Sequence, residues 1–272
     1  MSEIHYYEFL AAQRPLNRAQ QAEVREFATG ATITAKEFSV EYDDRELQVD
    51  PVYLMLHYYD AHLYTANFGS RRVLLKLPRA ALPPHTAEQY GVNDRVMFAA
   101  AGEQLILDLV SEDIDEDYDR SHVLEDIAGV RDEIAAGDLR PLYLAWLASY
   151  GEWERDESTF CDEDEDLVEP PVPAGLDKIT APQQALATFL RLDDDLLAVA
   201  SQAPPDDLAA LEASVKGLPD AEKDQLLLAV ARGQAAQTRT ELLRGTDPPR
   251  RTVGELLDAA ATLRPLSCRC GI

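Results

Sequence analysis

The sequence is poor in basic residues. Its 25 Lys and Arg residues stand against 50 Asp and Glu residues, and the formal net charge is −25 at pH 7. Proteins that bind nucleic acid without sequence preference neutralise phosphates with Lys and Arg, so a surface of this charge repels the polymer. Anionic membrane surfaces are disfavoured for the same reason. We therefore expect no direct nucleic-acid partner and no membrane partner.

Cysteine is scarce and long apolar runs are missing. The three cysteines, Cys161, Cys268 and Cys270, cannot form a disulfide framework, and an odd number is typical of free thiols in a reducing compartment. No stretch approaches the roughly 18 uninterrupted apolar residues of a membrane-spanning helix. Residues 1–5 also lack the basic start and apolar core of a signal peptide. These absences predict a cytoplasmic protein.

Sequence motifs of the common enzyme classes are missing as well. There is no Gly-x-Ser-x-Gly, no Walker-type loop and no Gly-x-Gly-x-x-Gly. Two acidic runs, 111–119 and 161–166, lack the central glycine of a calcium-binding EF-hand loop. The Cys-x-Cys pair near the end of the chain offers only two of the four usual zinc ligands. We therefore expect no cofactor and no dedicated metal site, and we favour a protein that is not an enzyme.

The pattern of apolar residues predicts an α+β protein. The first 110 residues alternate between segments typical of strands and segments typical of helices, and short breaks at Gly69 and Gly102 indicate hairpins. This order predicts a mostly antiparallel sheet with helices, followed by a helical C-terminal region. We expect strands at 4–9, 32–42, 62–68, 72–77, 95–99 and 104–110, and helices at 17–28, 50–59, 84–90, 123–136, 139–150, 182–190, 194–201, 206–216, 220–232 and 251–263.

Composition divides the chain into four parts. An α+β domain with two trailing helices covers residues 1–155, and an acidic, proline-rich linker covers 156–176. A small helical domain follows at 177–263, and residues 264–272 form a C-terminal tail. The linker is predicted because neighbouring like charges repel and because prolines remove backbone hydrogen-bond donors.

The acidic charge is concentrated in the middle of the chain. Residues 111–169 hold 21 acidic and 4 basic residues, so this segment carries about two thirds of the excess negative charge. Solubility alone does not require such concentration. We interpret two acidic runs as solvated loops that engage a basic protein partner, and a partner that itself handles nucleic acid would present a suitable basic groove. The predicted partner-binding residues are Glu112, Asp113, Asp115, Glu116, Asp117, Asp162, Glu163, Asp164, Glu165 and Asp166.

Two alternatives remain open at the level of sequence. The first is a metal-dependent enzyme with a site around His57, Asp60 and His62, to which Tyr64 or Arg72 would contribute. Two histidines five residues apart do not have the spacing of a zinc site on one helix, so the competing interpretation is an aromatic packing cluster. The second alternative is a structural subunit of a larger complex that makes its contact through residues 142–153. The oligomeric state is left open.

Several segments carry a resemblance to a known group of proteins. The chain resembles an uncharacterised family of acidic bacterial proteins, and the resemblance extends to about Leu263. The resemblance implies no activity, cofactor or functional residue, and it implies a member that is shortened at its C-terminus. The segments that carry it are HYYEFLAAQRPLNRAQQAEV, SRRVLLKLPRAAL, GDLRPLYLAWL, EPPVPAGLDKITAPQQALATFLRLDDDLLAVA and RRTVGELLDAAA.

Overall fold

The computed structural model describes residues 2–113, 124–151, 165–202, 215–232, 238, 242 and 250–263. The chain folds into two compact units, each built from two separate segments. The sheet unit comprises Met1–Ala136 and Thr180–Arg191, and the helical unit comprises Gly137–Ile179 and Leu192–Ile272. The predicted division at 155, 176 and 263 stays a prediction.

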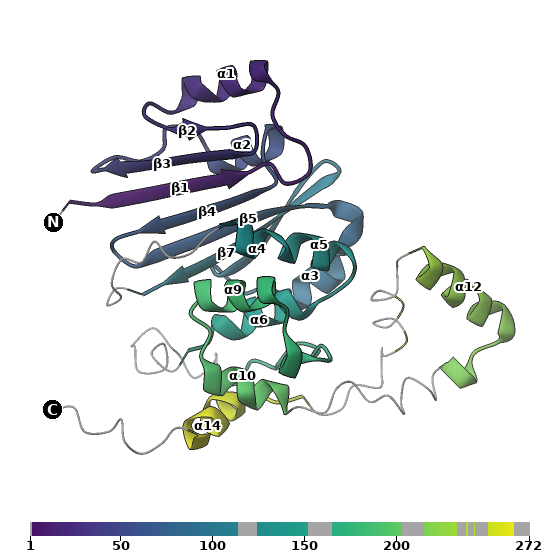
Figure 1. The fold of residues 1–272 in the computed structure, drawn as a ribbon. Helices are drawn as coiled ribbons and strands as arrows, with labels where there is room; N and C mark the ends of the chain where they lie inside the picture. Colours follow the sequence, from purple (N-terminus) through teal and green to yellow (C-terminus); the bar gives the residue numbers. More distant parts are fainter. Residues whose placement is uncertain are drawn as a thin grey trace, which may run out of the picture. The chain divides into compact units, whose positions relative to one another are not determined.

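A seven-stranded antiparallel sheet forms the sheet unit, which confirms the predicted α+β class (Figure 1). The strand order is β2-β3-β1-β4-β5-β7-β6, so β1 lies inside the sheet between β3 and β4. The bounds are β1 Ile4–Leu10, β2 Thr32–Ile33, β3 Glu37–Asp43, β4 Ala61–Ala66, β5 Ser70–Pro78, β6 Val96–Ala101 and β7 Gln104–Glu112.

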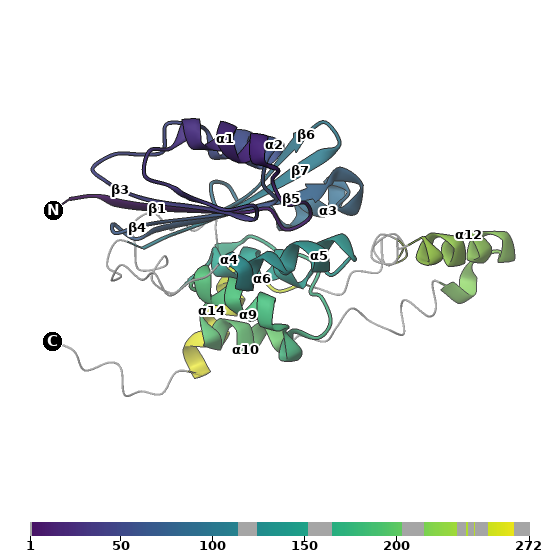
Figure 2. The ribbon, with the colours of Figure 1, turned by 45° about the horizontal axis from the view of Figure 1, so that its top comes forward.

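Helices cover both faces of this sheet. In Figure 2, α1 and α2 lie above the sheet, and α4 and α5 lie below it. The helices of the sheet unit are α1 Arg18–Phe27, α2 Pro51–His57, α3 Pro84–Tyr90, α4 Leu124–Ala128, α5 Val130–Ala135 and α9 Ala181–Phe189, with a short 3₁₀ turn, η1, at Arg79–Ala81.

Capping residues explain where α1 and α2 begin. The Asn17 side chain accepts hydrogen bonds from the first turn of α1, and Asp50 does the same for α2, as their positions before the helices predict. The predicted helix over 123–136 is instead interrupted at Gly129. A side chain there would meet Pro182, because a Cβ atom on Gly129 would lie 2.8 Å from the proline Cγ atom. The predicted helix over 206–216 lies outside the described residues except for its last two positions.

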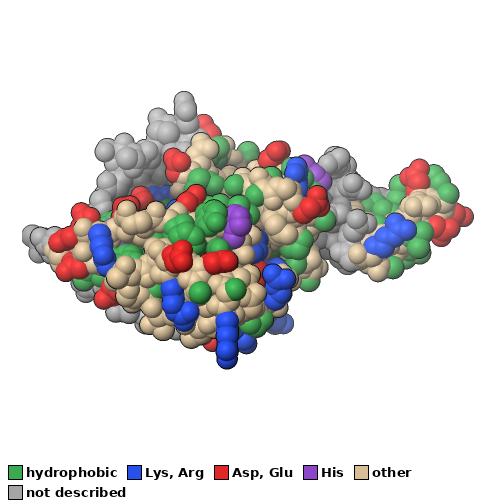
Figure 3. All heavy atoms as spheres, turned by 90° about the horizontal axis from the view of Figure 1, so that it is seen from above, with side chains coloured by type: hydrophobic (Ala, Val, Ile, Leu, Met, Phe, Trp, Pro, Cys, Tyr) green, Lys and Arg blue, Asp and Glu red, His purple; other side chains and the backbone are tan. Residues whose placement is uncertain are grey.

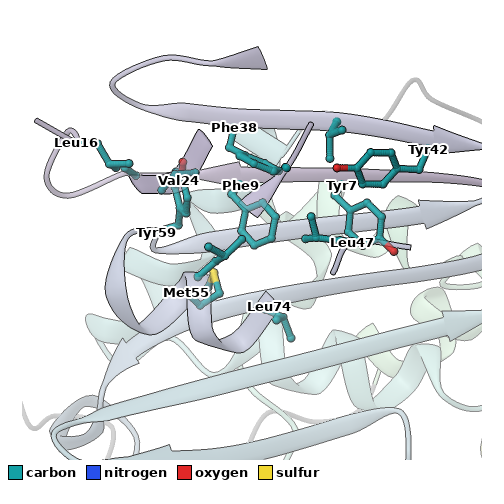
Figure 4. Close-up of a cluster of buried hydrophobic side chains, with 14 of the residues drawn as sticks. Tyr7, Phe9, Leu16, Val24, Phe38, Tyr42, Leu47, Met55, Tyr59 and Leu74 are labelled. Atoms are coloured by element: carbon teal, nitrogen blue, oxygen red, sulfur yellow. The ribbon is translucent and has the colours of Figure 1, made fainter. Parts of the chain in front are cut away.

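The core on the α1 and α2 side is rich in aromatic residues (Figure 4). Phe9 and Phe38 project from neighbouring strands and pack edge to face, with their ring centroids 5.2 Å apart. Tyr59 follows α2 and is completely buried against them. Because these large rings are removed from water, this cluster fixes α1 and α2 against the strands.

The helical unit has a core of its own. The elements of the unit are α6 Arg140–Ala148, η2 Leu176–Lys178, α10 Asp194–Ser201, α12 Asp220–Ala231 and α14 Val253–Leu263. Helix α10 packs against α14, η2 and α6, and an isolated bridge joins Val168 to Thr252. Nearly the whole of α6 is buried, including Leu142 to Leu147, which belong to the segment predicted as a subunit contact.

Candidate functional site

His62 is held in the interior of the sheet unit. Its imidazole stacks on Phe9 with a centroid distance of 4.1 Å and is parallel to Tyr7 at 6.2 Å. Since a carbonyl oxygen only accepts, the 2.8 Å contact to the Glu8 carbonyl makes Nδ1 the donor. Burial lowers the pKa of His62 to about 3, so the ring is neutral at physiological pH. The side chain fills space between aromatic rings, as in the packing-cluster interpretation.

Asp60 is bound by structural partners. One carboxylate oxygen lies 3.2 Å from Lys76 Nζ, and the other accepts a 2.8 Å hydrogen bond from the backbone N–H of Gln13. Lys76 also donates to the Met55 carbonyl at 2.7 Å. The Asp60 and Lys76 side chains are only 9% and 14% exposed. This ion pair therefore joins α2, β5 and the segment that follows β1.

His57 is exposed at the end of α2, and its contacts differ from those of His62 and Asp60. Its Nδ1 donates to the Tyr53 carbonyl at 2.8 Å, and its ring stacks on Tyr53 with centroids 4.1 Å apart. Phe27 and Tyr58 complete this aromatic group. The three residues of the alternative metal-dependent site thus have separate partners. In the part of the chain that the structure describes, no group of three or more His, Cys, Asp or Glu side chains is arranged to hold a metal ion.

Tyr64 and Arg72 are directly opposite each other on β4 and β5. The Tyr64 hydroxyl lies 2.9 Å from Nδ1 of His5. Arg72 forms a bidentate pair with Asp108 on β7, with N–O distances of 2.8 and 2.6 Å. The hydrogen bonds that Arg72 donates to Asp108 raise the pKa of Arg72 further above its already high value. Asp108 therefore neutralises Arg72, and the pair links two adjacent strands.

The structure describes four of the ten predicted partner-binding residues. Glu112 is exposed at the end of β7, and the backbone of Asp113 donates to the Gly69 carbonyl at 3.2 Å. Asp166 is exposed, whereas Glu165 is partly buried where α14 begins, its Cβ atom close to Gly254. Both runs therefore start or end at ordered elements. The remaining six lie outside the described residues: Asp115, Glu116, Asp117, Asp162, Glu163 and Asp164.

A buried polar network in the helical unit escaped the sequence analysis. Glu169 is 1% exposed and accepts a short hydrogen bond from the Tyr143 hydroxyl. Arg251 pairs with the same carboxylate through two contacts, of 2.9 and 2.7 Å. Glu169 precedes two prolines at the end of an acidic run, which is typical of a linker. The local sign of such a network is Tyr143, whose hydroxyl lies among apolar residues of α6 and requires a partner when buried.

Several arginines of the sheet unit bind backbone carbonyls. Arg71, which is 6% exposed, donates to the Phe189 carbonyl at 3.2 Å. Arg131 donates to the Lys76 carbonyl at 2.6 Å, and Arg191 to the Gly69 carbonyl at 2.9 Å. These cations stabilise the ends of helices and strands, so they do not contribute to an exposed basic patch.

None of the described helices is long and apolar enough to cross a membrane. Comparison with models of protein families, with curated proteins and with solved structures finds no match for the chain.

Proposed function

We propose that this protein is a non-enzymatic interaction protein that engages a basic protein partner through its acidic runs. The observation that carries the proposal is the distribution of charge. Residues 111–169 hold 21 acidic and 4 basic residues, and Glu112 and Asp166, at the described borders of the runs, are exposed. Closely spaced exposed carboxylates attract a cationic surface and accelerate its association.

The placement of the basic residues supports the proposal. Arg72 and Lys76 pair with carboxylates inside the sheet unit, and Arg251 pairs with Glu169 inside the helical unit. Arg71 and Arg131 are buried and donate to backbone carbonyls. Each of these cations is therefore engaged with a carboxylate or a carbonyl of the folded units.

The class of partner follows from the same charge. A protein with a basic groove, such as one that handles nucleic acid, offers the Lys and Arg side chains that such a surface binds. Salt-dependent association is then expected, since exposed charges more than about 10 Å apart are largely screened at 0.1 M salt.

Affinity capture from the native host tests this function. The bait is the full chain, compared with a variant in which Asp162, Glu163, Asp164, Glu165 and Asp166 are changed to Asn or Gln. We expect one basic protein to be retained by the wild type and lost by the variant, and the purified pair should bind in a salt-dependent manner. A matched control neutralises five exposed acids elsewhere: Glu37, Asp43, Glu46, Glu88 and Glu103.

The control separates a specific site from net charge. If the control loses the partner to the same extent as the variant, only total charge matters and the acidic runs are not the binding site. If all three baits retain the same proteins, the proposed function is wrong.

A further inference from the structure

Four aromatic side chains gather on the surface formed by α1 and α2. We call Phe27, Tyr53, His57 and Tyr58 the aromatic platform. His57 stacks on Tyr53 with centroids 4.1 Å apart, and Phe27 meets Tyr53 edge to face at 5.8 Å. Tyr58 lies 6.2 to 6.5 Å from each of the other three rings. The rings therefore form one continuous aromatic surface.

Two rings of the aromatic platform are exposed to solvent. Tyr53 is 40% exposed and His57 is exposed as well, whereas Phe27 and Tyr58 are partly buried against the core. Figure 3 looks onto the molecule from the side of α1 and shows hydrophobic side chains gathered beside a histidine, with acidic side chains at their border. Aromatic rings exposed in this way are enriched at protein interfaces.

Hydrogen bonds hold the platform in one arrangement. His57 Nδ1 donates to the Tyr53 carbonyl, which fixes the imidazole above the Tyr53 ring. The Tyr58 hydroxyl donates to Glu23 Oε2 at 3.1 Å. Desolvation and the Glu23 carboxylate together raise the pKa of Tyr58 to about 12, so the hydroxyl keeps its proton and the hydrogen bond persists. A partner thus meets rings that are already positioned, which lowers the entropic cost of binding.

Carboxylates border the platform. Glu23 is exposed on α1, one helical turn before Phe27. Asp50 is exposed at the start of α2, one turn before Tyr53. Glu23 Oε1 has no hydrogen-bond donor among the residues that the structure describes. The surface therefore combines exposed π faces with carboxylates that can still accept hydrogen bonds.

We propose that the aromatic platform, with Glu23 and Asp50 at its border, binds an arginine side chain of the basic partner. A guanidinium group stacks flat on an aromatic ring and donates several N–H groups to a carboxylate, whereas a lysine ammonium group matches neither geometry as well. The chain already uses this pairing, because the Arg45 guanidinium lies 4.2 Å above the Tyr42 ring. The inference rests on the proposed function, since it names one contact that a basic partner makes.

Two peptides provide the probe. Each is blocked at both ends; one carries two arginines separated by glycine, and the other carries lysines at the same positions. Titration is followed by the aromatic ¹H–¹³C signals of Tyr53 and His57. We expect the arginine peptide to bind the full chain about threefold more tightly than the lysine peptide, in keeping with an exposed cation–π contact.

Neutral variants test the site without changing the net charge. Tyr53→Ala and His57→Ala are expected to reduce the arginine preference to about one, and Tyr53→Leu, which keeps apolar bulk but lacks the ring, should do the same. Phe68→Ala is the matched control, because Phe68 is 45% exposed elsewhere on the sheet unit, and it should keep the preference. Equal affinity of the two peptides for the wild type, or a preference that survives Tyr53→Ala and His57→Ala, overturns the inference.

The outcome is distinguishable from failure of the proposed function. The variant with residues 162–166 neutralised should bind both peptides more weakly but keep the arginine preference. If that variant still captures the partner while Tyr53→Ala loses the preference, the platform stands and the role of the acidic runs fails. If the wild type self-associates and Tyr53→Ala is monomeric in sedimentation, a second copy occupies the platform, which contradicts the inference.

Discussion

Glu169 and Arg251 form a bidentate ion pair inside the helical unit, although 82 positions separate them in the sequence. The Glu169 side chain is 2% exposed and the Arg251 side chain 27%. Arg251 also donates to the Val199 carbonyl at 3.0 Å, so one guanidinium joins Glu169 to the end of α10. A buried carboxylate is tolerated here because the cation and the Tyr143 hydroxyl replace its water.

Removal of Arg251 should destabilise the helical unit. Arg251→Met leaves the Glu169 carboxylate buried without its cation, and the free energy of unfolding is expected to fall by about 2–4 kcal/mol. Urea denaturation followed by circular dichroism measures the change. Lys178→Met is the control, because the Lys178 to Asp177 pair is mostly exposed and 3.9 Å long, and this variant should be close to wild type. Equal stability of the two variants would show that the buried pair is not important.

Asp60 is expected to act in stability rather than in catalysis. Asp60→Ala leaves the partly buried Lys76 ammonium group and the Gln13 N–H without their acceptor, so we expect a loss of about 2–3 kcal/mol in denaturation experiments. Asp60→Asn keeps an acceptor for Gln13 and should lose less. If instead a divalent cation raises the melting temperature of the wild type and Asp60→Asn abolishes that shift, the metal-dependent alternative is correct.

His62 should make the protein sensitive to mild acid. Its pKa is lowered to about 3 in the folded state by burial, against about 6.5 in the unfolded chain. The unfolded chain therefore takes up a proton first as the pH falls below 6.5, and the free energy of unfolding decreases by about 1–2 kcal/mol between pH 7 and pH 5. His62→Asn, which can still donate to Glu8, should lack this part of the pH dependence. Urea denaturation of both proteins at pH 7, 6 and 5 gives the comparison, and parallel curves would contradict it.

Gly129 should not tolerate a methyl group. In Gly129→Ala the new Cβ atom would lie 2.8 Å from Pro182 Cγ and 3.3 Å from its Cβ, and a proline ring cannot rotate away. We expect a loss of about 1–3 kcal/mol, since α9 must shift to relieve the contact. Gly91→Ala is the matched control in the same unit, with ordinary contacts of 3.6 Å or more. A hydrogen-exchange measurement on α9 would report the shift directly, and unchanged protection in Gly129→Ala would refute it.

Local elements were predictable because their signals are local. The helices over Pro84–Tyr90 and Asp194–Ser201 have the predicted bounds, and Asn17 and Asp50 cap helices as predicted. Periodicity and capping act over a few residues, so the sequence displays them directly. The close approach of Pro182 to Gly129 could not be predicted, because the proline lies more than 50 positions away along the chain.

The candidate sites divide in the same way. The concentration of acidic residues between 111 and 169 is a property of the sequence alone. The class of partner that we propose follows from this concentration. The sequence alone does not distinguish His57 from His62, because both are histidines beside aromatic residues in the same segment. Only the pairing of β4 with β1 buries His62 against Phe9, while the end of α2 leaves His57 in solvent. Composition and short-range periodicity thus determine charge and secondary structure, whereas burial and ion pairing depend on contacts between distant residues, which the tertiary structure decides.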